Sequence, residues 1–216
     1  MLATKQQQQA LFKIFLSGTK LVFKKGELII HPGEGPTGVF FIEAGIVKAY
    51  NISKYGEENL LIIRKSQEIF PLIWAFTSRE RNIIYEALEN TCVWRIDRQT
   101  YLDYVLSHKQ VLLPMLDMTM EMYRIHSERI INLEYRTVRE RLVSFLLTMS
   151  QRFGVKNKDG SILIDVPLKQ QDIASAINSA RETTSRELVR LERLGLVANG
   201  SGKVTLVDLP ALRKIL

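Results

Sequence analysis

Four side chains near the C-terminus have the types and the spacing to contact the edges of DNA base pairs. They are Arg181, Glu182, Ser185 and Arg186. Residues three and four apart are neighbours on a helix, so the four would share one face. An arginine can donate to both O6 and N7 of guanine, and a carboxylate can accept from N4 of cytosine. An exposed helix with Glu–Arg pairs would contain the same residue types. The segments around these residues must therefore distinguish a DNA-reading helix from a charged helix that contacts only solvent.

The segments around this face indicate a helix-turn-helix. Residues 170–177 predict a short helix, and Asn178 follows at a turn where a positive φ is often required. Ser179 is expected to cap a second helix, with Glu182 completing an S-x-x-E capping box. In this motif the N-terminal half of the second helix enters the major groove, and most of the four side chains would lie there.

A predicted hairpin after the second helix adds a wing. Gly195 is placed to end the helix, residues 199–202 (NGSG) predict a hairpin turn, and residues 203–207 return as a strand. Lys203 in this wing is expected to contact DNA whatever its sequence, and Ser179 is a further candidate contact. Helix, turn, helix and wing in one run favour DNA binding over a merely solvated charged helix.

Positive charge is concentrated in the same part of the chain. Residues 136–216 contain 14 Lys and Arg against 8 Asp and Glu, whereas residues 1–135 contain 16 against 15. A basic segment suits a polyanionic partner, because neutralising phosphates releases counterions. A basic surface in contact only with solvent would have the same composition, so charge supports the DNA interpretation without proving it.

A long helix is predicted over residues 110–133, where Pro114 is tolerable only in the first turn. Apolar and small residues recur along it at alternating spacings of three and four, as in a coiled-coil seam. The seam residues are Leu113, Leu116, Met120, Tyr123, Ser127 and Ile130. We expect them to form a homodimer interface; a helix that lies on its own domain is the alternative.

The N-terminal half predicts a β-barrel. A short amphipathic helix over 4–17 precedes β-rich runs at 21–23, 28–30, 39–42, 46–50, 60–63 and 91–96, with glycine-containing turns between several of them. Many short strands with glycine corners are typical of a sandwich or jelly roll. The expected fold class is α+β, with a sensor barrel over 1–108, a dimerisation helix over 109–135 and a winged helix-turn-helix over 136–216.

These motifs resemble the Crp–Fnr superfamily, which includes the cyclic AMP receptor protein and the fumarate-nitrate reductase regulator. Residues 181–188 (RETTSREL) and 191–197 (LERLGLV) resemble its recognition helix. Residues 23–29 (FKKGELI), 32–34 (PGE) and 39–48 (VFFIEAGIVK) resemble strands of its cyclic-nucleotide-binding-like barrel. The resemblance covers nearly the whole chain and implies a homodimer. It also implies base contacts by Glu182, Ser185 and Arg186, and by Arg181 as in the cyclic AMP branch.

The effector site departs from the family. Pro71 and Leu72 stand where cyclic-nucleotide binders carry Gly-Glu, and proline offers no N–H while leucine cannot bond a ribose hydroxyl. Arg81 could still align with the phosphate-binding arginine, so a cyclic-nucleotide-responsive regulator remains the alternative. A tentative effector pocket comprises Ile69, Phe70, Leu72, Ile73, Trp74 and Arg81. Its apolar members suit a hydrophobic or aromatic effector, or else simply fill the barrel.

Other functional classes find little support. A single cysteine cannot hold an iron–sulfur cluster, and His31, His108 and His126 lack a ligand-pair spacing for haem. Cys92 is therefore expected to be a buried apolar filler, with redox sensing as a minority interpretation. We expect no cofactor and no bound metal. Without a nucleophile–base pair, P-loop or metal cluster, we also expect no enzyme.

The sequence therefore predicts a dimeric, sequence-specific transcription regulator that binds an inverted repeat in double-stranded DNA. If it activates, RNA polymerase is a further partner, and a small-molecule effector stays open. A module that has lost DNA contact is the remaining alternative. The chain has no signal segment or run of about 20 apolar residues, and it has one cysteine. A cytoplasmic protein without membrane contact is expected.

Overall fold

The computed structural model describes residues 2–200 and 202–216, whose contacts divide the chain into two compact units. The first contains residues 2–56 and 61–123, and the second contains residues 57–60 and the described residues from 124 onward. The long helix α4 (Leu112–Tyr135) supplies residues to both units. Residues 57–60 belong with the second unit, where Arg129 Nη1 donates to the Leu60 carbonyl oxygen at 2.6 Å.

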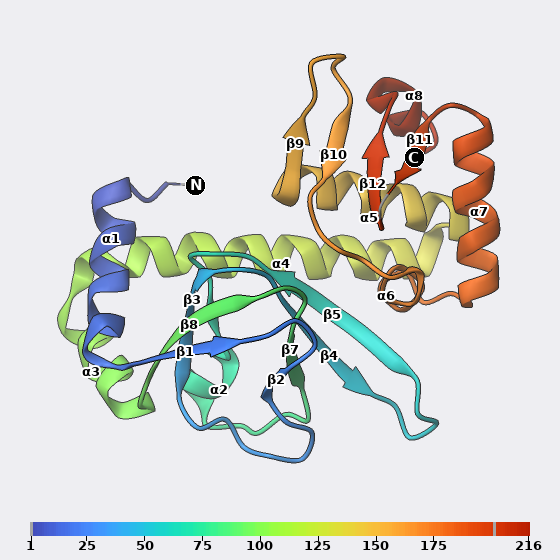
Figure 1. The fold of residues 1–216 in the computed structure, drawn as a ribbon. Coiled ribbons are helices and arrows are strands. Elements are labelled where there is room, and N and C mark those ends of the chain that lie inside the picture. Colours follow the sequence, from blue (N-terminus) through green and yellow to red (C-terminus); the bar gives the residue numbers. More distant parts are fainter. Residues whose placement is uncertain (1, 201) are drawn as a thin grey trace. The chain divides into compact units, whose positions relative to one another are not determined.

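Two four-stranded sheets form the predicted jelly roll of the first unit (Figure 1). The first sheet has the order β1 (Thr19–Phe23), β8 (Thr91–Ile96), β3 (Val39–Ala44) and β6 (Ile69–Phe70). The second has the order β2 (Leu28–Ile30), β7 (Ile84–Ala87), β4 (Val47–Ile52) and β5 (Glu58–Arg64). β-Branched and aromatic residues predominate in these strands, as half-buried pleated surfaces favour.

Aromatic rings join the two sheets inside the barrel. The Phe70 ring stacks on Phe40 at 5.2 Å and on Tyr85 at 4.7 Å between ring centroids, which links β3, β6 and β7. Gly45, at the corner after β3, has φ +96°, and a Cβ there would lie 2.7 Å from the Thr91 Cα. Only glycine therefore fits this corner.

Helices cover the outer face of the first sheet. They are α1 (Lys5–Lys13) with the 3₁₀ turn η1 (Ile14–Ser17), α2 (Leu72–Thr77), α3 (Arg98–Ser107), the 3₁₀ turn η2 (Lys109–Val111) and the start of α4. Leu11 and Phe15 are buried there, and the Phe15 ring lies 5.3 Å from that of Phe41 in β3. The predicted amphipathic helix is thus confirmed, and its apolar face meets the sheet.

The second unit contains the C-terminal elements. After the end of α4 come α5 (Val138–Phe153), β9 (Gly154–Lys156), β10 (Ile162–Ile164), α6 (Gln170–Ala176), α7 (Arg181–Arg193), β11 (Val197–Gly200), β12 (Lys203–Leu206) and α8 (Leu209–Arg213). The four strands form one antiparallel sheet of order β11-β12-β10-β9. α5 begins with a capping box between Thr137 and Glu140, which satisfies N–H groups at the helix start.

Several elements had no signal in the sequence. No element was expected between residues 67 and 90, where the structure has β6, α2 and β7. These elements are two, six and four residues long, too short for a periodic hydrophobic pattern to reveal. Within residues 2–200 and 202–216, no helix is long and apolar enough to cross a membrane.

Candidate DNA interface

The predicted helix-turn-helix is formed by α6 and α7. Asn178 in the turn has φ 51°, the left-handed conformation that asparagine tolerates. The inward residues of α7, which are Thr184, Leu188 and Leu191, are at most 1% exposed. With this face buried, the opposite face of α7 is presented to solvent.

The predicted cap of α7 is wrong. The helix begins at Arg181 with Ala180 as its N-cap, and no side chain caps it. Ser179 instead donates to the Ala180 carbonyl oxygen at 3.4 Å. Because the helix begins one residue later than expected, Glu182 occupies the second helical position and not the third, so the reciprocal capping box cannot form.

Gly195 ends α7 as predicted. Its φ is +71°, its N–H donates to the Glu192 carbonyl at 2.9 Å, and the Leu196 N–H donates to the Leu191 carbonyl at 3.0 Å. These two bonds form a Schellman motif, which satisfies carbonyls that the helix end leaves open. The chain then enters β11 directly, which fixes the position of the wing relative to α7.

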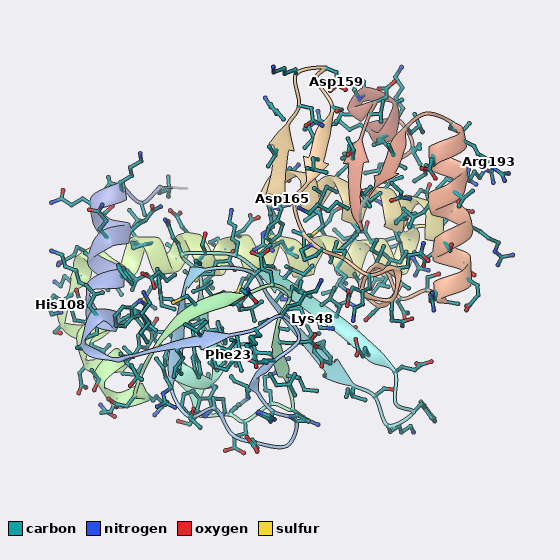
Figure 2. All side chains as sticks on the ribbon, in the orientation of Figure 1. Phe23, Lys48, His108, Asp159, Asp165 and Arg193 are labelled. Atoms are coloured by element: carbon teal, nitrogen blue, oxygen red, sulfur yellow. The ribbon has the colours of Figure 1, made fainter. Side chains whose placement is uncertain are left out.

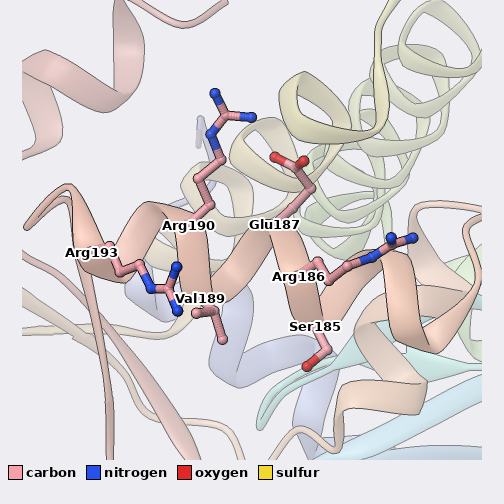
Figure 3. Close-up of a pocket in the computed structure, with 6 residues that line it drawn as sticks. All are labelled: Ser185, Arg186, Glu187, Val189, Arg190 and Arg193. Carbon is pink, nitrogen blue, oxygen red and sulfur yellow. The ribbon is translucent and has the colours of Figure 1, made fainter.

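Three of the four predicted base-reading side chains are exposed on α7, namely Arg181, Glu182 and Arg186, while Ser185 is half-buried. Arg186 Nη2 donates to the Thr183 hydroxyl at 3.2 Å. Among the described residues, the side chains of Arg181 and Glu182 make no hydrogen bond or ion pair. An open depression of about 520 Å³ runs along this helix (Figure 3). It is lined by Ser185, Arg186, Glu187, Val189, Arg190 and Arg193.

Two further cations on this surface were not among the predicted DNA contacts. Arg190 and Arg193 extend the positive charge of Arg186 toward the C-terminal end of α7, and both are exposed. Figure 2 shows Arg193 projecting from α7. Their spacing of four and then three residues from Arg186 was the available signal. We call Arg181, Arg186, Arg190 and Arg193 the arginine face.

The acidic residue within this depression is already paired. Glu187 Oε2 accepts from Arg139 Nε of α5 at 2.6 Å. The Glu187 carboxylate raises the pKa of Arg139, as expected for a cation beside an anion. This pairing reduces the repulsion that a phosphate would meet at Glu187 and fixes α7 against α5.

The wing forms as predicted from β11 and β12, with Gly200 opposite Lys203 in the ladder. Ser201, in the predicted turn, lies outside the described residues. Lys203 Nζ forms an ion pair with Asp165, which follows β10. No local pattern indicated this partner, because it is 38 positions away. Asp165 offsets part of the charge that Lys203 could offer to DNA.

The six residues of the predicted effector pocket do not converge on one space. Ile69 and Leu72 pack in the core between the first sheet and the helices, whereas Phe70 points into the barrel. Trp74 packs against the edge of the same helical core. Ile73 is 50% exposed, and Arg81 is also exposed. Residues 72–77 form a helix, and successive side chains on a helix turn by about 100°, so they face different surroundings.

Cys92 is not a buried filler. It is half-exposed on β8, and its thiol lies 3.1 Å from the Glu43 carboxylate, which also accepts from Trp94 Nε1. Burial and this carboxylate raise the pKa of Cys92, which keeps the thiol protonated at neutral pH. Among the described residues, no group of three or more His, Cys, Asp and Glu could hold a metal ion.

The predicted dimer seam is largely uncovered. Leu116, Met120, Tyr123 and Ile130 of α4 are 49, 51, 69 and 57% exposed, and Leu113 and Ser127 are half-buried. Large apolar side chains repeated along one helix are rarely left in water. The opposite side of the helix carries buried residues such as Met115 and Asn132, so α4 has one packed and one open face.

Comparisons with known proteins agree with this architecture. Residues 20–108 match the family model of the cyclic nucleotide-binding domain, and residues 140–215 match that of the Crp-like helix-turn-helix domain. The global nitrogen regulator of Nostoc sp. is 30% identical over 190 residues, covering 85% of this chain and 82% of the relative. The global nitrogen regulator of Synechococcus elongatus is 29% identical over 197 residues, covering 88% of this chain and 86% of the relative. The structure of FixK2 from Bradyrhizobium japonicum is similar with a TM-score of 0.79 and 23% sequence identity. The match covers 92% of this chain and 96% of the FixK2 chain.

Proposed function

Because the chain belongs to the Crp–Fnr superfamily and is a DNA-binding transcription regulator with a sensor domain, we propose that it reads an inverted repeat as a homodimer. The exposed face of α7 is the observation that carries this proposal. Arg181, Glu182, Ser185 and Arg186 face solvent wholly or in part, with no apolar cluster between them. Arginines can read guanine, and Glu182 can accept from cytosine.

The remaining cations suit the DNA backbone. Arg190 and Arg193 lie toward the C-terminal end of α7, beyond the half that enters the groove, and are assigned to phosphates. Lys203 adds a further contact from the wing. Phosphate contacts hold the protein in register, and the base contacts give sequence preference. We assign no enzymatic activity to either unit, and if the protein is an activator, RNA polymerase is its further partner.

The homodimer is proposed to form along α4. Leu116, Met120, Tyr123 and Ile130 supply an apolar stripe with the spacing of a coiled-coil seam. Two copies joined by a two-fold axis would present two α7 helices to successive major-groove segments, with centres about 10 bp apart.

Selection from random duplexes tests the proposal. The purified protein should enrich an inverted repeat with half-site centres about one helical turn apart. The affinity for the selected site should fall steeply with salt, because several phosphates are neutralised. Enrichment of a single unrepeated site would contradict the dimer, and absence of any enrichment would contradict sequence-specific reading.

The sensor is proposed not to respond to cyclic AMP. Pro71 is the N-cap residue of α2 and has no N–H to offer, and Leu72 is 6% exposed within the apolar core. Losing two hydrogen bonds to charged groups costs about 3–6 kcal/mol, or a factor of a hundred or more in affinity. Calorimetric titration should show no saturable binding near micromolar concentration. If binding does occur, Arg81→Ala would test the alternative role of that arginine.

A further inference from the structure

A ring of polar side chains closes the joint between α4 and α5 within the second unit. Only Arg136 and Thr137 separate the two helices. Arg136 Nη1 donates to the Asn132 amide oxygen at 2.7 Å, and Asn132 Nδ2 donates to the Ser144 hydroxyl of α5 at 2.9 Å. The Ser144 hydroxyl donates to Glu128 Oε1 at 3.4 Å, and that oxygen also accepts from Arg136 Nη1 at 3.1 Å. The four side chains thus form one closed ring of hydrogen bonds.

The ring fixes the direction in which α5 leaves α4. Glu128, Asn132 and Arg136 follow one another at intervals of four residues along one side of α4, and Ser144 lies in the second turn of α5. Asn132 and Ser144 are 8% and 4% exposed. Apolar packing is non-directional, whereas hydrogen bonds hold their donors and acceptors to narrow angles. Because buried, linked hydrogen bonds also strengthen one another, the ring specifies a single angle between the two helices.

The angle between α4 and α5 also determines where α7 lies. Arg139, in the first turn of α5, forms the 2.6 Å ion pair with Glu187 of α7. Ile130, at the end of the proposed seam, lies two residues before Asn132. The end of the seam, the ring and α7 all belong to the second unit. A change in the α4–α5 angle would therefore move α7 relative to the two-fold axis of the dimer.

We propose that the ring of Glu128, Asn132, Arg136 and Ser144 determines which spacing between half-sites the dimer accepts. This inference rests on the proposed reading of an inverted repeat and names the residues that set its geometry. The four are positioning residues, and none of them is assigned to a base or a phosphate. One extra base pair moves a half-site by about 3.4 Å along the duplex and by about 35° around it. Two α7 helices held at one separation and angle cannot follow both changes.

The dependence of DNA affinity on spacer length tests the ring. The half-sites of the selected repeat are kept, and the spacer is shortened or lengthened by one base pair. The wild-type protein should bind the altered spacers about tenfold more weakly, a loss on the scale of a mismatched base pair. Asn132→Leu combined with Ser144→Ala replaces both partners of one buried hydrogen bond by apolar groups, which a protein interior tolerates. In this double variant the penalty should fall to about threefold, because α7 can then follow the displaced half-site. The control Ser150→Ala removes a buried hydroxyl that donates to the Leu147 carbonyl within α5, and it should keep the wild-type penalty.

Base preference and oligomeric state separate the joint from a general loss of structure. The double variant should keep its preference at the G·C pair read by Arg186 and should elute as a dimer, because neither substituted side chain belongs to α7 or to the seam. An unchanged spacer penalty, or a loss of base preference together with spacing, would overturn the inference. Equal binding of all three spacers by the wild-type protein would also overturn it, whether or not the double variant folds. Selection of an inverted repeat with relaxed spacing overturns only the joint, whereas absence of any selected repeat overturns the proposed function as well.

Discussion

Arg186 combines exposure with a position in the N-terminal half of α7. Its single described hydrogen bond, to Thr183, holds one nitrogen and leaves the other donors of the guanidinium for a base. Arg186→Ala should weaken binding to the selected site by about 1–3 kcal/mol and relax the preference at one G·C pair. Fluorescence anisotropy with single-base variants of the site measures both effects. Arg213→Ala, an exposed arginine on α8, is the matched control. Unchanged affinity and base preference in Arg186→Ala would refute the assigned face.

The ion pair with Asp165 controls how much positive charge Lys203 can offer to DNA. Lys203→Ala should weaken binding to all sequences alike and reduce the salt slope by up to about one. Asp165→Asn keeps the shape of the side chain, frees the Lys203 charge and should strengthen binding to all sequences. Titrations of specific and random duplexes at several salt concentrations measure both variants. A change of preference at one base pair, in either variant, would show that the wing reads sequence.

At the scale of elements, the start of α5 links helix capping to pH. Hydrogen bonds from Thr137 lower the pKa of Glu140. The ionised Glu140 carboxylate therefore stabilises the folded protein at neutral pH, and this stabilisation is lost as pH falls through the lowered pKa. Thr137→Ala should reduce the free energy of unfolding by about 1 kcal/mol at pH 7, and by less at pH 3. Urea unfolding at both pH values measures the difference.

The cap of α1 provides a matched control. Thr4 and Gln7 form a capping box of the same geometry, but Gln7 does not titrate. Thr4→Ala should therefore reduce the free energy of unfolding by a similar amount at pH 7 and pH 3. If Thr137→Ala and Thr4→Ala lowered the free energy of unfolding with the same dependence on pH, the assignment of the pH-dependent stabilisation to Glu140 would be wrong.

At the scale of the whole molecule, DNA affinity should depend on the dimer. Ile130→Glu would place like charges against each other across the proposed seam, which is strongly unfavourable. The variant should elute as a monomer on size-exclusion chromatography and lose affinity for the inverted repeat. Ile131→Glu places the same charge one residue further, at a flanking position where charges are tolerated, and should remain dimeric. A monomeric wild-type protein at micromolar concentration would contradict the seam.

The sequence by itself determined the features that depend on local patterns. The α6–α7 pair, the left-handed Asn178, the Gly195 helix end and the wing were readable because turn chemistry and helical periodicity act over a few residues. The amphipathic α1 and most strands of the barrel were readable for the same reason. These features suffice for the family and for Arg181 and Arg186, whereas Arg190 and Arg193 were recognised on the same helix only in the structure.

Only the tertiary structure decided which distant side chains meet. Arg64 and Met122 are 58 positions apart, Cys92 and Glu43 are 49 apart, and no local pattern links either pair. The tentative effector pocket failed to converge because the short helix α2 turned its residues toward different surroundings. A side chain's partners depend on how strands and helices pack, so the charge that Asp165 removes from the wing appears only in the folded chain.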